Sequence, residues 1–463
     1  MRIKFGLAVG MLAVTLSATA EEGIGKLELT QVEELPGDKG NRILVFKHKA
    51  VEEMDSPGYV AAGYEYHVTF GIPEGYRPEE KTPLPVILFL HGFGDTWQDI
   101  RKSPNYFPSV FTLVPNDPLG TWFYGYSDQL PKGDPNQGTV VNYTERRLLA
   151  YLEHFEHLYP IDRNRVYVMG GSMGGTGTTS LALRYPNLFA AADAKKGATN
   201  RTYCKWKSQC ESIWGRAESK VKNNDGVNVW DWQNMAWYAE HHHAAATWIR
   251  TMHGREDASI PYRQVAGPPG VSPMSFYSAL ETFKIGHECL WDCSSHSLPA
   301  LKPFAADDWW EPFSDATCFF RLDLSFPAFS HFSASNNPGT GAGDAVGPDT
   351  QLGDNTYDGD PNGGLNRFLR WNSTTISDQP SHYSIEIKLS SGPSGYRGKG
   401  EVVDVTPRRL QKFEVKPGAT YAWSTSAEQS GQAAADAGGI LTIPAVKVGT
   451  AWTKLTIQPS RKN

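Results

Sequence analysis

The stretch "RVYVMGGSMGGTG", residues 165–177, contains a single serine between two pairs of glycines, directly after a mostly apolar run. The apolar run predicts a buried strand, and "TGTTSLALRYPNLF" from Thr176 predicts a helix that ends at Tyr185–Pro186. Gly170-Gly171-Ser172-Met173-Gly174 therefore matches G-x-S-x-G between a strand and a helix. On this sharp turn, small neighbours let the strand and the helix approach each other, so that the hydroxyl group is exposed. The pattern predicts that Ser172 is a nucleophile.

Strands and helices alternate along the chain on both sides of this turn. Apolar or alternating runs predict strands at 41–51, 64–76, 85–90, 165–170, 189–198, 244–254 and 287–293. Helical spacing of apolar residues predicts helices at 144–160, 176–185 and 272–286. This alternation predicts an α/β fold with a mainly parallel sheet and helices on both faces.

The pattern changes after residue 302. A turn-rich segment at 336–364 is followed by short runs that predict strands at 381–390, 401–407, 411–418, 420–425, 439–446 and 453–459. Short strands separated by turns are typical of a β-sandwich. A chain of 463 residues is also longer than one core usually fills. We therefore expect a catalytic α/β domain at 21–302 and an all-β, sandwich-like domain at 303–463.

A serine nucleophile needs a base, and the base needs an acid that orients it. With this motif the chain order is serine, then Asp or Glu, then histidine. The segment "REDASIP" follows the strand predicted at 244–254, and the spacing from Asp257 to Ile260–Pro261 resembles the acid loop of many such hydrolases. We therefore predict Asp257 as the acid, and expect Glu256 to pair with Arg255 at the surface.

Two histidines compete for the role of base. His287 begins the strand predicted at 287–293, and His296 follows the end of that strand. Ligands of an open α/β sheet bind at the carboxyl ends of the strands. His287 is therefore about 20 Å from the correct edge, at about 3.3 Å per residue. We predict His296 as the base and His287 as a structural residue.

Backbone amides must stabilise the oxyanion that forms during the reaction. One candidate is the N–H of Met173, directly after the nucleophile. The second is the N–H of Phe93 in "HGFGD", where Gly92 and Gly94 let the loop bend toward a substrate. We expect His91 to brace this loop rather than act as a base.

Together these residues resemble the α/β-hydrolase superfamily over about residues 40–302. "LHGFGD", "YPIDRNRVYVMGGSMGG" and "LWDCSSH" resemble secreted esterases, namely feruloyl and acetylxylan esterases of carbohydrate esterase family 1 and polyhydroxyalkanoate depolymerases. The resemblance implies a Ser-His-Asp ester hydrolase that needs no metal or other cofactor. The serines of "SSH" and the cysteines around them depart from the pattern of these families.

The expected substrate is a feruloyl or acetyl ester on a polysaccharide, with a polyester as the alternative. Two other functions stay open at this point. One is a serine peptidase of the prolyl-oligopeptidase type, and the other is a carbohydrate-binding protein with an inactive hydrolase domain.

A tryptophan-rich insertion lies at residues 199–243, between two predicted strands. Loops at the carboxyl edge of a sheet commonly form lids and pockets, where aromatic rings bind sugars or aryl groups. The alternative is that these rings form the small core of the lid. The candidate substrate-binding residues are Trp206, Trp214, Trp230, Trp232 and Trp237. The adjacent His241–His243 are expected to be solvated rather than metal-bound.

The first twenty residues indicate export. Arg2 and Lys4 precede an apolar run, and Ala18-Thr19-Ala20 is a typical cleavage site, so 1–20 is predicted to be a signal peptide. No stretch is long and apolar enough to insert into a membrane. A secreted or periplasmic protein with five cysteines is expected to form disulfides, whose connectivity stays open. A net charge of −6 gives no reason to expect a nucleic acid as partner.

The acidic loop at 344–360 is a candidate calcium site. "DNTYDGDPNGGL" resembles a calcium loop, but Leu365 stands where an EF-hand needs a bidentate glutamate. A structural Ca²⁺ held by Asp354, Asp358 and Asp360 is one possibility. Turn residues of a long surface loop are the other.

Overall fold

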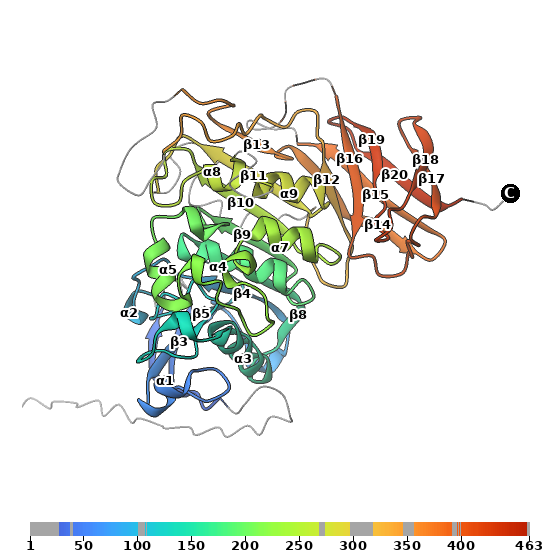
Figure 1. Cartoon of the computed structure of the whole chain (residues 1–463). Helices are drawn as coiled ribbons and strands as arrows, with labels where there is room; N and C mark the ends of the chain where they lie inside the picture. Colours follow the sequence, from blue (N-terminus) through green and yellow to red (C-terminus); the bar gives the residue numbers. More distant parts are fainter. Residues whose placement is uncertain are drawn as a thin grey trace, which may run out of the picture.

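The computed structural model describes residues 27–37, 40–100, 107, 109–267, 274–296, 318–345, 356–390, 396, 398 and 400–460 (Figure 1). Its largest element is a sheet with the strand order β1-β2-β3-β5-β4-β8-β9-β10-β11-β13. The strands from β5 to β11 in this order are parallel to their neighbours, and β1, β2, β3 and β13 pair antiparallel. In chain order the strands are β1 Thr30–Pro36, β2 Arg42–Lys49, β3 Glu65–Ile72, β4 Leu84–Leu90, β5 Phe111–Pro115, β8 Ile161–Gly171, β9 Ala191–Lys195, β10 Trp248–Gly254, β11 His287–Asp292 and β13 Gly363–Leu365.

The parallel register brings the carboxyl ends of the central strands to one edge. Leu90 of β4 pairs with Gly170 of β8, and Gly171 pairs with Lys195 of β9. Gly254 of β10 pairs with Asp292 of β11. The loops that follow these strands therefore lie at a common edge, where ligands of open α/β sheets bind.

The described helices that pack on the central strands lie mainly over one face. The main helices are α3 Tyr143–Leu158, α4 Met173–Arg184, α7 Met235–His242 and α9 Phe276–Thr282. The shorter ones are α1 Pro57–Ala61, α2 Trp97–Ile100, α5 Lys207–Trp214, α6 Val229–Trp232 and α8 Arg263–Ala266, with 3-10 turns at Pro78–Glu80, Pro135–Gln137, Arg201–Tyr203 and Ala217–Ser219. Alternate strand residues such as Leu88, Val168 and Ile249 share one apolar cluster with α3, α4 and α9. Strand alternation therefore explains this face.

The opposite face of the large sheet is covered mainly by residues of the C-terminal region. Ile87, Tyr167 and Trp248 point away from those helices and pack with residues such as Phe320 and Trp371 of the C-terminal region. Among the described helices, α2 lies on this side, where the ring of its Trp97 stacks on His67 of β3 at 4.7 Å. The predicted helices are thus found on one face, whereas on this face the described residues pack mainly against β strands of the C-terminal region.

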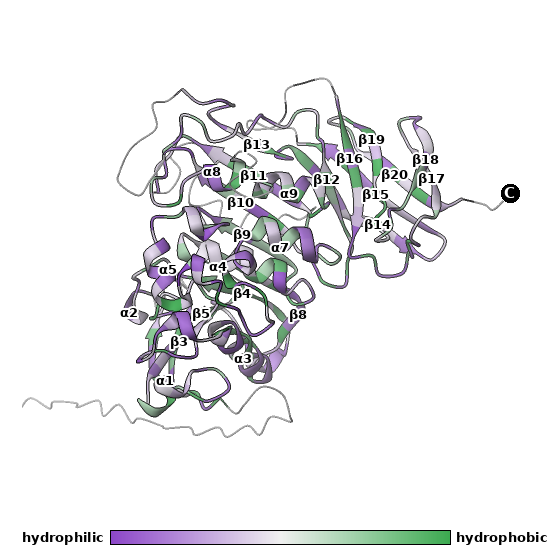
Figure 2. Cartoon of the chain, in the orientation of Figure 1, coloured by the Kyte–Doolittle hydropathy of each residue, from purple (hydrophilic) through white to green (hydrophobic). Residues whose placement is uncertain are grey.

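The C-terminal region forms two further sheets that share one apolar core. The first has the order β12-β16-β19 and the second β14-β15-β20-β17-β18. Figure 2 shows hydrophobic and hydrophilic residues alternating along these strands, as expected for sheets buried on one side. Their bounds are β12 Phe326–Ser330, β14 Leu369–Gln379, β15 His382–Leu389, β16 Glu401–Arg408, β17 Thr420–Thr425, β18 Ser430–Ala434, β19 Ile443–Val448 and β20 Thr453–Pro459. A small hairpin, β6 Tyr126–Ser127 and β7 Val140–Val141, lies in the α/β part.

One predicted strand and the predicted domain boundary need comment. Residues 411–418 form no strand, because the carboxylate of Asp378 accepts the backbone N–H groups of Gln411, Lys412 and Phe413 at 2.6–3.1 Å. Backbone N–H groups that already donate to a carboxylate cannot also donate to a neighbouring strand. The boundary predicted at 302/303 lies outside the described residues. The C-terminal region nevertheless contributes β13 to the large sheet, where it pairs with β11.

Candidate active site

Ser172 lies on the turn between β8 and α4, as the motif predicted. Its backbone has φ 57° and ψ −120°, which is a strained conformation for a residue with a side chain. The turn is held because the N–H of Ser172 donates to the carbonyl of Lys195 at 2.9 Å. The side chain is half-buried at the carboxyl edge of the sheet.

The glycines around Ser172 are required by close backbone contacts. A Cβ atom on Gly170 would lie 2.6 Å from the carbonyl oxygen of Leu90, and one on Gly174 would lie 1.9 Å from the same atom. A Cβ on Gly175 would lie 2.5 Å from the carbonyl oxygen of Lys195. Glycine therefore lets the first turn of α4 pack against the ends of β4 and β9.

The structure brings the three predicted residues of the triad together. The Nε2 atom of His296 lies 2.8 Å from Ser172 Oγ, and its Nδ1 atom lies 2.7 Å from Asp257 Oδ2. Asp257 is 1% exposed, and its Oδ1 accepts the backbone N–H groups of Ser259 and Ile260, both at 2.9 Å. The carboxylate is thereby fixed in orientation. This arrangement can take a proton from the serine hydroxyl through the imidazole.

The two amide groups predicted for an oxyanion hole come from neighbouring segments. Met173 is the first residue of α4, so its N–H has no partner within the helix. Phe93 lies in the loop after β4, and the carbonyl of His91 in this loop comes within 2.9 Å of the Cβ position of Gly174. The loop and the start of α4 are therefore adjacent, as an oxyanion hole requires.

The other polar candidates near the site have structural contacts. Nε2 of the buried His91 accepts the backbone N–H of Asp117 at 2.9 Å, while Nδ1–H donates to the carbonyl of Gly92 at 2.7 Å. His91 thus braces the loop of Phe93. His287 is buried at the start of β11, where Nε2 lies 3.1 Å from Glu281 Oε1.

The expected surface pair between Glu256 and Arg255 is wrong. Arg255 is buried and donates to Asp344 at 2.5 and 3.3 Å and to Asp358 at 3.4 Å. Glu256 instead accepts the hydroxyl of Tyr357 at 2.6 Å. Residues of the C-terminal region therefore hold the segment that leads to Asp257, which local sequence does not reveal.

The five tryptophans of the insertion occupy different environments. Trp214 and Trp230 are buried and donate their indole N–H groups to the carbonyls of Gly125 and Gly215. Their predicted contact with substrate is therefore wrong, because they form the core of the insertion. Trp232 and Trp237 are half-buried, packed against Tyr238 and His241.

Trp206 contacts a residue of the predicted site, Phe93. It is half-buried, and its ring centroid is 4.4 Å from that of Phe93. The insertion thus contacts the loop that carries the second oxyanion candidate. Phe93 and Trp206 together present aromatic surface beside that loop.

All five cysteines are free thiols, so the expected disulfides are not confirmed. Cys289 lies in the core shared with the helices, whereas Cys318 lies in the core on the opposite face. The large sheet separates them. Cys318 instead donates to the carbonyl of Trp371 at 2.9 Å, and Cys293 donates to the carbonyl of Pro361 at 3.4 Å.

The calcium prediction remains a prediction. Asp354 lies outside the described residues. The Oδ2 atom of Asp358 accepts both the N–H and the hydroxyl of Thr340, and Oδ2 of Asp360 accepts the N–H of Asn337 at 2.8 Å. Within the described ranges, no group of three or more His, Cys, Asp or Glu side chains is arranged to hold a metal ion.

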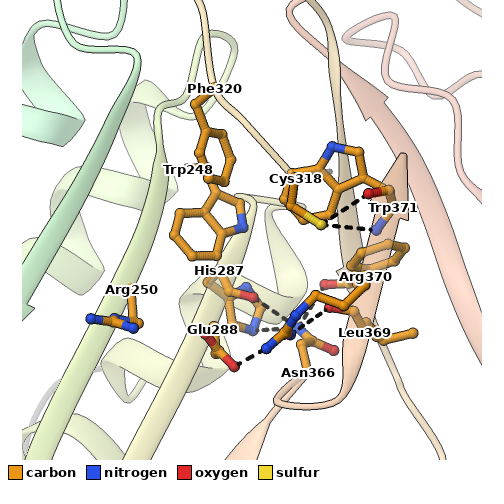
Figure 3. Close-up of a pocket in the computed structure, with 11 residues that line it drawn as sticks. Trp248, Arg250, His287, Glu288, Cys318, Phe320, Asn366, Leu369, Arg370 and Trp371 are labelled. Carbon is orange, nitrogen blue, oxygen red and sulfur yellow. Dashed lines mark hydrogen bonds and ion pairs between the residues drawn. The ribbon is translucent and has the colours of Figure 1, made fainter. Parts of the chain in front are cut away.

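A pocket lies at the opposite edge of the large sheet (Figure 3). Trp248 and His287 begin β10 and β11, and their side chains line it together with Phe320, Arg370 and Trp371. Figure 3 shows the Arg370 guanidinium between Glu288 and Asn366, and the Glu288 carboxylate lies 4.0 Å from it. This pocket lies at the amino ends of the strands, away from Ser172.

None of the described helices is both long and apolar enough to cross a membrane.

Residues 60–264 match the family model Esterase, described as "Putative esterase". Feruloyl esterase B of Neurospora crassa is 31% identical over 140 residues, which cover 28% of this chain and 44% of that protein. A protein of Arabidopsis thaliana named "Probable glutamyl endopeptidase, chloroplastic" is 28% identical over 163 residues, 33% of this chain and 17% of its own length. This chain therefore spans less than half the length of these relatives.

Solved structures of hydrolases were also found. An S-formylglutathione hydrolase from Agrobacterium tumefaciens is 17% identical, with a TM-score of 0.39 over 58% of this chain and 92% of its own. A ferulic acid esterase is 14% identical, with a TM-score of 0.37 over 56% of this chain and 92% of its own. The resemblance to esterases predicted from the motifs is confirmed: residues 60–264 match the Esterase family model, and the chain is similar to feruloyl esterase B.

Proposed function

We propose that this protein is a secreted serine esterase that hydrolyses carboxylic esters, with feruloyl or acetyl groups on polysaccharide as its substrate class. The observation that carries the proposal is the hydrogen-bonded chain from Ser172 through His296 to Asp257, with distances of 2.8 and 2.7 Å. The match to the Esterase family and the similarity to feruloyl esterase B support it.

The reaction proceeds in two steps. His296 Nε2 takes the proton of Ser172 Oγ as the oxygen attacks the ester carbonyl, and the protonated imidazole then gives this proton to the leaving alcohol. Water, deprotonated by His296, attacks the acyl-enzyme and releases the acid and the free serine. Asp257 keeps Nδ1 protonated, because its carboxylate accepts that hydrogen and its other oxygen is held by two amides.

The N–H groups of Met173 and Phe93 stabilise the oxyanion in both steps. Each such donor contributes about 3 kcal/mol to the transition state in comparable enzymes. The helix dipole of α4, which starts at Met173, favours negative charge at the same point.

The half-buried rings of Phe93 and Trp206 support an aromatic acyl group or a sugar ring as the bound part of the substrate. An aryl ring stacks on such a surface with about 1 kcal/mol beyond the area it buries. A polyester is the alternative substrate, since its chain also binds to aromatic surface.

A second candidate function is a serine peptidase. It is favoured by the similarity to the protein of Arabidopsis thaliana whose name is glutamyl endopeptidase. The same nucleophile, base and acid cleave amides and esters. Cleavage of a glutamyl p-nitroanilide without cleavage of any ester would favour the peptidase.

The test is a panel of substrates with matched variants. We expect the purified protein to hydrolyse at least one of p-nitrophenyl acetate, methyl ferulate, acetylated xylan and a polyhydroxybutyrate suspension. Ser172→Ala is expected to lower kcat by about 10⁴-fold or more. Ser278→Ala, which changes an exposed serine on α9, is the control and should retain full activity. A folded wild type that is inert on all four esters and on the anilide would overturn the proposal.

Export is part of the same proposal. It rests on residues 1–20, which lie outside the described residues. A calcium ion in the acidic loop is also a proposal. Carbohydrate binding by residues 303–463 is a further proposal. Detection of the protein beginning at Glu21 in the medium or periplasm of its host would support export. Recovery of the uncleaved chain from the cytoplasm would contradict it.

A further inference from the structure

Lys196 is a buried lysine beside the candidate active site. It follows β9, is 4% exposed, and has a positive φ of 50°. Its backbone N–H donates to the carbonyl of Met252 on β10 at 2.7 Å. The residue before it, Lys195, accepts the N–H of Ser172 through its carbonyl. The backbone at Lys196 is therefore tied both to the nucleophile turn and to β10.

The ammonium group of Lys196 contacts the loop that carries His296. Its Nζ atom donates to Ser294 Oγ at 2.6 Å and to the carbonyl oxygen of Ser295. The hydroxyl of Ser294 in turn donates to Oδ1 of Asp292, which also accepts the N–H of Ser294 at 2.9 Å. A chain of hydrogen bonds thus runs from Lys196 through Ser294 to the last residue of β11.

The same loop packs against the segment that leads to Asp257. A Cβ atom on Gly254 would lie 2.1 Å from the carbonyl oxygen of Ser294 and 3.0 Å from Lys196 Nζ. The N–H of Glu256 donates to the carbonyl of Ser294 at 3.2 Å. Gly254 therefore provides the space in which the lysine and the loop meet.

Burying an ammonium group costs free energy, so compensating interactions are expected around it. Burial lowers the pKa of Lys196, while the nearby carboxylates of Asp292 and Asp257 raise it. A charge removed from water is retained in proteins where it is hydrogen-bonded and neutralised. The hydroxyl of Ser294 and the carbonyl of Ser295 supply the hydrogen bonds, and both lie within two residues of His296.

We propose that Lys196 is a positioning residue for His296: its ammonium group holds the backbone of Ser294 and Ser295, so that the imidazole reaches both Ser172 and Asp257. The inference rests on the proposed function, since it gives Lys196 a role in the same reaction. The imidazole of His296 is 31% exposed, so packing confines it less than it confines Asp257. Its position therefore depends on the backbone that precedes it.

The central experiment compares Lys196→Met with Lys284→Met. Lys284 is a matched control, because it also has a positive φ, 54°, and its Nζ also donates to a serine hydroxyl, that of Ser330 at 2.9 Å. It lies before β11, at the other edge of the sheet. We expect Lys196→Met to lower kcat on the best ester about 10- to 100-fold, with KM changed less than about 3-fold, because a displaced base loses the attack geometry. Lys284→Met should retain wild-type kcat.

Two further variants separate positioning from a general loss of structure. Ser294→Ala removes one acceptor and leaves the carbonyl of Ser295, so we expect a loss of about 3- to 10-fold in kcat. Lys196→Cys, treated with 2-bromoethylamine, regains an ammonium group at nearly the original distance and should recover most of the lost kcat. Wild type treated in the same way controls for modification of the native thiols.

The readout also includes the hydrogen bond between His296 and Asp257 by proton NMR. A low-field proton that is present in wild type and in Lys284→Met, and lost in Lys196→Met, supports the inference even without a suitable ester. If Lys196→Met keeps that proton and wild-type kcat, the inference is overturned. Failure of the proposed function is a different result: wild type and Ser172→Ala are then equally inert, while the NMR comparison still decides the role of Lys196.

Discussion

The two ends of β10 and β11 differ in what holds them. At the carboxyl ends, hydrogen bonds and charges dominate: Arg255 donates to Asp344, Asp257 is held by two amides, and Lys196 donates to the loop of His296. At the amino ends, aromatic rings pack beside the hydrogen bond between His287 and Glu281. The ring centroids of Trp248 and Phe320 are 4.6 Å apart.

This difference has a physical basis. Apolar packing is non-directional and stabilises in proportion to buried area, so the amino ends contribute mainly stability. Hydrogen bonds fix distances and angles, so the carboxyl ends contribute mainly geometry. Substitutions at the amino ends should change the free energy of unfolding with little change in kcat. Substitutions at the carboxyl ends should change kcat.

The largest effect on stability is expected for Trp371→Ala. Trp371 is 3% exposed, and its ring is 5.2 Å from Phe320 in the cluster that joins the C-terminal sheets to the large sheet. Removing a buried tryptophan costs about 4 kcal/mol. Denaturant unfolding measures the loss, and kcat measured well below the midpoint should be unchanged. Trp452→Ala, which changes a half-buried residue directly before β20 of the same five-stranded sheet, should cost clearly less, about 1 kcal/mol. A fall in kcat for the folded Trp371→Ala protein would break the comparison.

A somewhat smaller effect is expected for Arg255→Leu, and it tests whether the carboxyl end has both roles. The variant leaves the buried carboxylate of Asp344 without its guanidinium, at a cost of about 3 kcal/mol. It also frees the segment before Asp257, so kcat should fall about 10-fold. The double variant Arg255→Leu with Asp344→Leu should regain most of the stability, because no fully buried charge is then left unpaired. If it regains kcat as well, the ion pair does not position Asp257.

Sequence alone predicted the nucleophile turn because its signal is local. The glycines flanking Ser172 are needed within a few residues of it, so the requirement is visible in one short stretch. The choice of His296 over His287 followed from strand direction, and in the structure His296 lies next to Ser172 while His287 is buried at the far edge. Both predictions depend on constraints between residues that are close together in the sequence.

What sequence could not predict depends on contacts between distant segments. Periodicity shows that Tyr167 and Trp248 face an apolar layer, but not that β strands rather than helices supply it. The local sequence "AKKGA" does not indicate the contact that Lys196 makes, because its partner Ser294 is 98 residues away. The false strand at 411–418 has the same origin, since the carboxylate that takes its amides belongs to Asp378.

The smallest effect concerns pH and a buried histidine near the carboxyl end of β10. The ring nitrogens of His253 lie 3.0 Å from the carbonyl of Gly197 and 3.2 Å from the hydroxyl of Tyr277, and burial lowers its pKa from 6.5 to about 4. Between these values the unfolded chain binds a proton that the folded chain does not, so stability falls as the pH falls. At pH 5.5 the loss relative to pH 8 is about 1.4 kcal/mol, one unit below the unfolded pKa. We expect the difference in unfolding free energy between pH 8 and pH 5.5 to be about 1.4 kcal/mol smaller in His253→Gln than in wild type. The exposed His331→Gln should behave as wild type. An unchanged pH dependence in His253→Gln would mean that burial does not hold the pKa of His253 below its usual value in the folded protein.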